Sequence, residues 1–256
     1  MFWFKKKEVV IDCFTMHRSV YELYKPHNSI KYFPSNIKQI PKNFKYIDET
    51  TKIEYDGSTI RSCIGLMEHY KHGITLPMWT DFICQPSTAV AGETAIGLMS
   101  NPFQFTSHPK NQYPGLYEDH IHVKFGSPWL FKESSGVKFL WNQATWNLSE
   151  HWRNFLVLPG TVSYDVQCQT NVNIFIDKKS ENFKLNAGTP LVHITPLSDK
   201  KIKLKTHLVS YEEHQKLSVP EDYMMVPGGK RYLKYISDLK AERERDSTKC
   251  PFGFGK

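Results

Sequence analysis

The stretch from residue 155 to residue 177, FLVLPGTVSYDVQCQTNVNIFID, decides the fold that we expect for this chain. Its last segment, NVNIFID, alternates aliphatic residues with others, and a period of two is typical of a strand with one apolar face. The Pro159-Gly160 pair indicates a tight turn between two such segments. The stretch therefore predicts short antiparallel strands joined by turns.

Segments of the same kind occur on both sides of this stretch, at intervals of roughly 8–12 residues. No long helix is predicted between them, which disfavours parallel βαβ units and favours a sandwich or barrel. We therefore expect a mainly β protein with an antiparallel β-sandwich or jelly-roll-like core and a few peripheral helices. The predicted strands are Glu8–Cys13, 74–84, Thr94–Met99, Glu118–Phe125, Pro128–Phe131, Val137–Trp141, Phe155–Leu158, Val162–Gln167, Asn171–Ile176, Phe183–Leu185, Pro190–Ile194 and Lys201–Val209.

Helical periodicity is confined to the two ends of the chain. Short helices are predicted at 15–24, 35–40 and 61–72, before most of the strands, and at 210–217, after them. In the third of these helices Ile64, Met67 and Tyr70 share one face, and Gly73 stands where a left-handed C-terminal cap is expected. We expect the N-terminal helices to wrap around the outside of the core.

A longer C-terminal amphipathic helix is predicted in GGKRYLKYISDLKAERERD, which places an apolar stripe among charged residues. We expect the stripe to dock on the core or on a partner, including a second copy of the chain. The predicted organisation is a β-sandwich domain with an N-terminal helical wrap at 1–209 and a helical extension with a tail at 210–256. The stripe consists of Tyr232, Tyr235, Ile236 and Leu239.

The composition limits the classes of partner. Aromatic residues make up 14% of the chain, so we expect a largely aromatic core. The 33 basic residues are opposed by 26 acidic residues, which gives a mixed surface and not a polybasic one. No RNA-binding, helix-turn-helix, phosphate-loop or dinucleotide-binding motif is present, and we expect no nucleic-acid partner. Lys201, Lys203 and Lys205 alternate with apolar residues, a pattern that protects an edge strand from pairing with other chains.

The cysteines and the N-terminus indicate the compartment. The five cysteines are widely spaced and form no CxxC pair, so neither a disulfide framework nor a cysteine zinc site is expected. The N-terminal MFWFKKK has its apolar residues before the lysines, which is the wrong order for a signal peptide. No apolar run reaches the ~20 residues that span a membrane. We therefore expect a protein of a reducing cytoplasm, with no membrane partner.

Two histidines in YEDHIHVKFGSPWLF form the clearest candidate for a metal site. On a strand His120 and His122 point the same way, at a separation that two ligands of one metal can bridge. Cupin metal sites use this HxH pattern with a glutamate a few residues later, which the following VKFGSPW lacks. Glu118, His108 or His193 would have to complete an Fe(II) or other divalent-metal site of the oxygenase type. The alternative is that these histidines are ordinary hydrogen-bonded or solvent-facing side chains.

A group of tryptophans predicts a different kind of site. Trp129, Trp141, Trp146 and Trp152 are interleaved with asparagine and glutamine residues. Indole rings stack on sugars and amides hydrogen-bond to their hydroxyls, so this composition is typical of a glycan-binding surface. Core tryptophans fit the same pattern, and both interpretations stay open.

The chain resembles a cyanophage-type family of proteins from tailed phages of marine bacteria, a family with no established activity. The resemblance rests on VVIDCFT, SPWLFKESSGVKFLWNQATWN, VLPGTVSYDVQCQTNVNIFI and GTPLVHITPLSDKKIKLKTHLV, in this order, and covers about residues 8–210. It implies a phage origin and a mostly β fold that ends in a strand with Gly188, Pro190 and Pro196. It implies no catalytic residue. Where the family has two tryptophans after the FP segment, this chain has Ser-Asn-Ile.

The leading expectation for function is a non-catalytic phage protein, either a virion or assembly component or a binding module. It rests on the many strand and turn signals and on the lack of a complete catalytic constellation. The expected partners are other phage proteins or a second copy of the chain, in the host cytoplasm during infection or in the virion. The alternatives are a cupin-like or Fe(II)-dependent oxygenase and a glycan-binding module.

Overall fold

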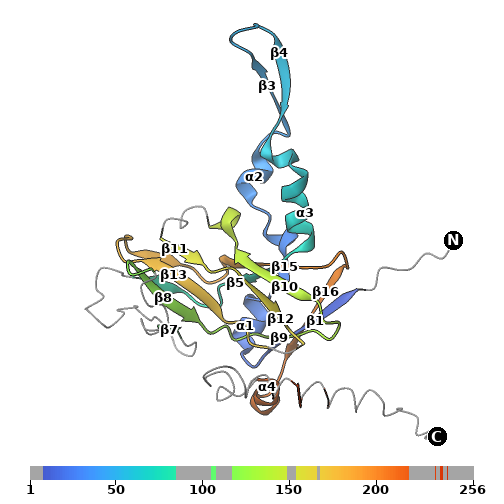
Figure 1. Ribbon diagram of the computed structural model, residues 1–256, viewed down its shortest axis with the longest axis vertical. Coiled ribbons are helices and arrows are strands. Elements are labelled where there is room, and N and C mark those ends of the chain that lie inside the picture. The colour runs from blue at the N-terminus through green and yellow to red at the C-terminus, as the bar shows by residue number, and fades with distance from the viewer. Residues whose placement is uncertain are drawn as a thin grey trace, which may run out of the picture.

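The computed structural model describes residues 8–84, 105–107, 117–148, 154–165 and 168–218, together with Lys234, Ser237, Asp238 and Ala241. The protein is mainly β, with several antiparallel sheets and few helices, and its body has a β-sandwich-like architecture (Figure 1). The expected fold class is therefore confirmed, while the finer jelly-roll topology stays a prediction. The expected strand Thr94–Met99 lies outside the described residues.

Three sheets and a short ladder form the body. The five-stranded sheet has the order β12 (Gly160–Ser163), β10 (Lys138–Gln143), β15 (Pro190–Pro196), β5 (Ile74–Pro77) and β2 (His27–Asn28). The four-stranded sheet has the order β11 (Phe155–Val157), β13 (Val172–Asp177), β8 (His120–Phe125) and β7 (Phe105–Ser107). The three-stranded sheet has the order β16 (Ile202–Leu208), β1 (Val9–Thr15) and β9 (Leu130–Lys132), and β14 (Phe183–Leu185) pairs with β6 (Phe82–Cys84).

Among the described strands, one pair is parallel and not antiparallel. β1 and β16 pair in parallel, from Val9 opposite Ile202 to Thr15 opposite Leu208. These strands come from the two ends of the expected domain, so no hairpin turn fixes their direction. The first and the last described strands therefore lie side by side in one sheet.

Aromatic side chains fill the interior, as the composition predicts. Trp79, Phe82, Phe125 and Tyr164 are almost completely buried in one continuous core cluster. The ring of Phe82 lies 4.7 Å from that of Phe125, and Tyr164 lies 5.2 Å from Phe131, measured between centroids. The core therefore depends on interlocking rings as well as on aliphatic strand residues.

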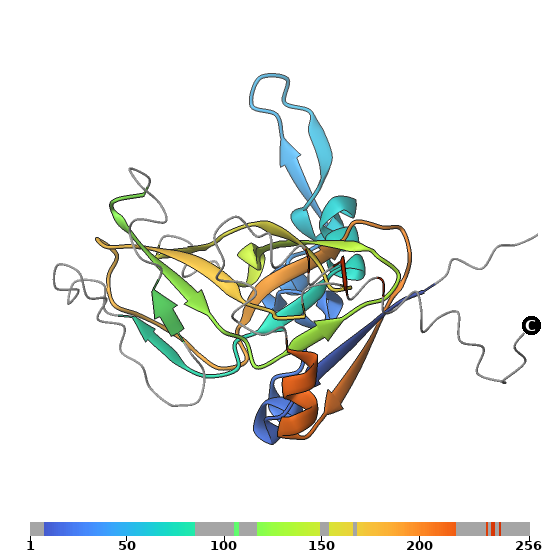
Figure 2. The ribbon, with the colours of Figure 1, turned by 60° about the horizontal axis from the view of Figure 1, so that its bottom comes forward.

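A hairpin projects from the body and was not predicted from the sequence. It consists of β3 (Asn43–Ile47) and β4 (Glu54–Ser58), which pair only with each other among the described strands. We call this hairpin the arm. Figures 1 and 2 show it at the far end of the molecule from the body. Its turn has no Asn-Gly or Asp-Gly signal; instead the Asp48 carboxylate accepts hydrogen bonds from the Thr50 and Thr51 amides, and Lys52 has a φ of 58°.

Short helices join the arm to the body. They are η1 (Ser29–Tyr32), α2 (Ser35–Gln39), η2 (Ile60–Ser62) and α3 (Ile64–His72), and we call α2, η2 and α3 the stalk. A second, small core of Phe33, Ile37, Leu66 and Tyr70 lies inside it. The Tyr70 hydroxyl donates to Asn147 Oδ1 at 2.8 Å, which fixes the stalk to η5 (Thr145–Asn147) of the body.

The predicted face of α3 was right for Tyr70 and Met67, which pack in or against the second core, and wrong for Ile64. Leu66 and Tyr70 are its buried residues, whereas Ile64, expected on the buried face, is 78% exposed. The reason is that α3 packs mainly on the second core, and only its C-terminal part meets the five-stranded sheet, where His69 stacks on His193. The expected left-handed cap was also wrong, because Gly73 has a φ of −94° and leads directly into β5.

The helix after β16 agrees with the prediction. α4 (Tyr211–Leu217) begins with a capping box, in which Ser210 Oγ accepts from the Glu213 amide and the Glu213 carboxylate accepts from the Ser210 amide. α4 lies beside α1 (Arg18–Leu23) in Figure 2. In the predicted C-terminal helix the described residues Lys234, Ser237, Asp238 and Ala241 are helical and exposed, while the apolar stripe lies outside the described residues. The division of domains at residue 209 stays a prediction.

Gly73 has no room for a side chain. A Cβ there would stand 2.2 Å from the His193 ring and 2.9 Å from Ser29 Oγ. We expect Gly73→Ala to lower the free energy of unfolding by about 1–3 kcal/mol, measured by urea denaturation, because the buried ring has to shift. Gly65→Ala, in the same helix with only Cys63 Sγ nearby, is the matched control and should be neutral or stabilising by up to about 1 kcal/mol. Equal stabilities of the two variants would contradict this packing argument.

Candidate functional site

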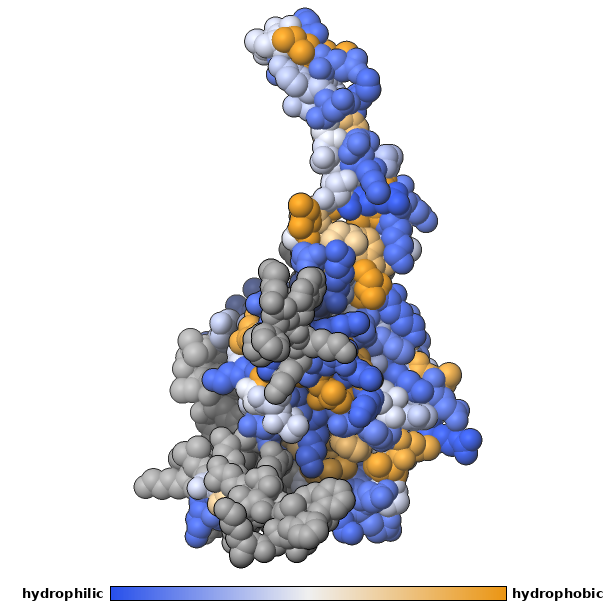
Figure 3. All heavy atoms as spheres, turned by 90° about the vertical axis from the view of Figure 1, so that its right-hand side faces the viewer, coloured by the Kyte–Doolittle hydropathy of each residue, from blue (hydrophilic) through white to orange (hydrophobic). Residues whose placement is uncertain are grey.

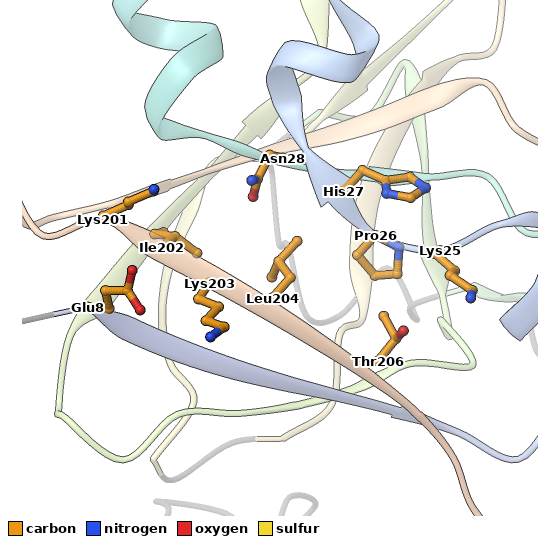
Figure 4. Close-up of a pocket in the computed structure, with 10 residues that line it drawn as sticks. All are labelled: Glu8, Lys25, Pro26, His27, Asn28, Lys201, Ile202, Lys203, Leu204 and Thr206. Carbon is orange, nitrogen blue, oxygen red and sulfur yellow. The ribbon is translucent and has the colours of Figure 1, made fainter.

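A groove of about 470 Å³ lies between the edges of two sheets. One wall is β16, at the edge of the three-stranded sheet, with Lys201 before it; the other is the segment 25–28, which includes the edge strand β2. Figure 4 shows Ile202 and Leu204 directed into the space between these walls, with Asn28 and Pro26 opposite. The prediction that the lysine-rich strand is an edge strand is therefore confirmed within the described sheets.

The charges of the groove are mostly positive. Lys25, Lys201 and Lys203 line it, against one carboxylate, that of Glu8. Burial, and then the charges of Lys31 and Lys25, lower the pKa of His27 below its usual value. Lys31 Nζ donates to His27 Nε2 at 2.7 Å, so a neutral imidazole acts as the acceptor. The groove is therefore suited to an anionic ligand.

A smaller cavity of about 340 Å³ continues the groove and shares Asn28, Lys201 and Ile202 with it. It adds the carboxylate of Asp199, and also Lys71 and His72, whose side chains both bind the Glu68 carboxylate, at 3.0 and 2.8 Å. Because Glu68 already pairs with these two groups, the unpaired positive charge of the site comes mainly from the first cavity.

A buried polar cluster lies where α3 meets the five-stranded sheet. His193 of β15 is 1% exposed, and its Nδ1 lies 3.1 Å from Ser29 Oγ. Ser29 Oγ and Thr75 Oγ1 share a hydrogen bond of 2.8 Å. The ring of His69 stacks on that of His193 with 3.6 Å between centroids.

The properties of this cluster suit a structural role better than a catalytic role. Burial, and then the neighbouring His69, lower the pKa of His193 to about 3, so the imidazole is neutral at pH 7. A serine beside a neutral histidine resembles a nucleophile with its base, but Ser29 is fully buried and cannot reach a substrate. Ser29 was not predicted from the sequence, and the stacking of His69 on His193 joins residues 124 positions apart.

The predicted metal ligands are only partly brought together. His120 and His122 share a face of β8, opposite Asp177 and Phe175 of β13, and the ring of Phe175 lies 5.9 and 5.2 Å from the two imidazoles. Glu118 precedes the strand in an exposed turn, so its predicted place within the strand was wrong.

The remaining predicted ligands do not complete this pair. His193 belongs to the other large sheet, where it contacts Ser29 and His69, and it forms no group of three ligands with His120 and His122. His108 lies outside the described residues. Over the described part of the chain, no three His, Cys, Asp or Glu residues are grouped so as to hold a metal ion.

Two of the four tryptophans predicted to form a glycan-binding surface do not lie at the surface. Trp129 and Trp141 are buried, and their indole N–H groups donate to the Tyr24 carbonyl at 3.3 Å and to the Tyr164 hydroxyl at 2.7 Å. Neither ring has a face available to a sugar, because both belong to the core. Trp146 is 44% exposed, and Trp152 lies outside the described residues.

Comparison of the chain with models of protein families and with curated proteins found no match. Of the helices in the described residues, none combines the length and the apolar character needed to cross a bilayer.

The buried cluster predicts a dependence of stability on pH. The folded state binds a proton at His193 only near pH 3, whereas the unfolded chain binds it near pH 6.5, so acidification favours unfolding over that interval. Between pH 7.5 and pH 5 this histidine should remove about 2 kcal/mol from the free energy of unfolding.

Urea denaturation at the two pH values measures this effect. We expect the difference to shrink by about 2 kcal/mol in His193→Gln, whatever the stability of that variant at pH 7.5. The other histidines with lowered pKa values, His17, His27, His69 and His214, titrate in both proteins. An unchanged pH dependence in the variant would show that His193 is not the group responsible.

Proposed function

We propose that the protein is a non-catalytic assembly component of phage origin, which associates with a second copy of itself through the arm. The observation on which the proposal rests is the exposed aromatic face of this hairpin. The resemblance to tailed-phage proteins supports the phage origin and a role in the virion or its assembly.

The aromatic face is formed by pairing across the hairpin. Phe44 lies opposite Gly57, and Tyr46 lies opposite Tyr55, so all four residues share one face. The ring of Tyr46 lies 5.7 Å from that of Phe44 and 5.5 Å from that of Tyr55. A Cβ at Gly57 would stand 2.5 Å from the Phe44 ring, so the glycine lets this ring lie across β4.

This face is open to solvent. Phe44, Tyr46 and Tyr55 are 41–48% exposed although they contact one another. Figure 3 shows hydrophobic residues at the surface of the arm and its stalk. Contiguous exposed apolar surface usually marks an interaction site, and tyrosine is enriched at the centres of protein interfaces.

The second copy is favoured by the architecture of the arm. Residues 43–58 contain two basic and four acidic side chains, so each arm has a net charge of only −2, although the whole chain has a charge of +7. An isolated two-stranded hairpin is marginally stable in water, and a second hairpin covering its aromatic face would add the missing layer. A two-fold axis lets each arm cover the same surface of the other.

Analytical ultracentrifugation over a hundredfold range of protein concentration tests the proposal. We expect a reversible monomer–dimer equilibrium that the double variant Tyr46→Ser/Tyr55→Ser shifts to monomer by about tenfold or more in dissociation constant. Ile47→Ser is the matched control, because Ile47 lies on the opposite face of the same hairpin and is 63% exposed. A wild-type protein that stays monomeric throughout, or a control that weakens association equally, would overturn the proposal.

The oxygenase alternative has its own test. After anaerobic incubation with Fe(II), and separately with Zn(II), followed by desalting, we expect elemental analysis to find no stoichiometric metal in the untagged protein. The physical reason is that the described residues supply only His120 and His122 at one place, two ligands fewer than a tetrahedral site needs. Near-stoichiometric metal that is lost in His120→Ala/His122→Ala would instead support the oxygenase alternative.

A further inference from the structure

We propose that the groove between β16 and β2 binds an extended acidic peptide, which adds to the open edge of β16 as a further strand. This interaction is independent of the arm, because β16, which lines the groove, lies on the body of the protein, away from the hairpin (Figure 1).

The first argument is the backbone on the two sides of the groove. β16 is paired with β1 along one edge only, and β2 is paired with β5 along one edge only, within the described sheets. Both strands are therefore edges, and the groove lies between them. An open strand edge presents N–H and C=O groups in the pattern that an added strand needs.

The second argument is size. The part of β16 that lines the groove, from Ile202 to Thr206, has a length of roughly 13 Å at about 3.3 Å per residue. The length suits about four or five residues of extended peptide. Ile202 and Leu204 provide an apolar floor against which alternate side chains of the added strand can pack.

The third argument is charge. Lys25, Lys201 and Lys203 exceed the single carboxylate of Glu8 in this groove, and no ion pair of these three lysines is found within the described residues. The same lysines discourage pairing with a second, equally basic β16 while complementing an acidic strand. A nucleic acid is disfavoured as the occupant because its affinity depends on many phosphate contacts, and this groove offers few cations.

The test uses the full-length protein and fluorescein-labelled hexapeptides in fluorescence anisotropy. The probe peptide alternates valine with glutamate. One comparison peptide has the same sequence with alternate amides N-methylated, and another has lysine in place of glutamate. A labelled single-stranded DNA tests the alternative that the groove binds any polyanion. We expect saturable binding of the acidic peptide and at least about tenfold weaker binding of the other three.

Variants of β16 locate the site. Lys201→Glu/Lys203→Glu should weaken binding of the acidic peptide by about tenfold or more. Lys138→Glu is the control, because Lys138 is exposed on β10 and lies on neither the groove nor β16. Hydrogen exchange measured by mass spectrometry should show slower exchange of amides in the stretch 202–206 when the acidic peptide is bound.

Three results would overturn the proposal. They are equal binding of the N-methylated peptide, equal weakening by Lys138→Glu, and binding of DNA without binding of any acidic peptide. Because the arm variants of the preceding subsection leave the groove intact, failure of self-association would not affect this experiment.

Discussion

The close contact between the Gly73 backbone and the His193 ring is the constraint on which the position of the arm depends. The chain leaves α3 at Gly73 and enters β5 at Ile74, so this residue connects the stalk to the five-stranded sheet. The imidazole occupies the space in which any other residue would have its Cβ, and Ser29 closes the site from the other side. The hydrogen bonds of Ser29 to His193 and Thr75 satisfy polar groups that burial would otherwise make costly. The stalk is thereby held in one place on the body by a contact that leaves little freedom.

Sheet edges and one exposed face of the described residues are the features from which both proposals are drawn. The body leaves the edges of β16 and β2 facing a basic groove, and the arm exposes an aromatic face on a two-stranded sheet. Both surfaces offer main-chain groups and rings for contact with another polypeptide, whereas the buried Ser29–His193 pair is inaccessible to a substrate. The same physical chemistry supports both proposals: unpaired strands and exposed rings gain free energy when another chain covers them.

The strands of the body were predictable because their residues obey a period of two in the sequence. β13 and β14 lie within a residue of their predicted bounds, and β15 extends two residues beyond the predicted end at Ile194. The features that were missed depend on contacts between distant segments. The buried face of α3 was set by Phe33 and Ile37, and the arm has exposed strands, so no apolar alternation towards a core marked it. Its turn relies on the Asp48 side chain and on Lys52 in a left-handed conformation, which lack the usual glycine signal.

The sequence by itself determined the fold class, the aromatic core, the edge character of the lysine-rich strand and the capped helix after it, because local periodicity and turn chemistry specify these features. Only the tertiary structure decided which candidate residues meet. His193 and the pair His120 and His122 look equally suitable as ligands in the sequence, yet they belong to different sheets, because strand order is fixed by the packing of the whole core. For the same reason two of the four tryptophans proved to be core residues, and the parallel pairing of the first and last strands of the body created the edge beside the groove.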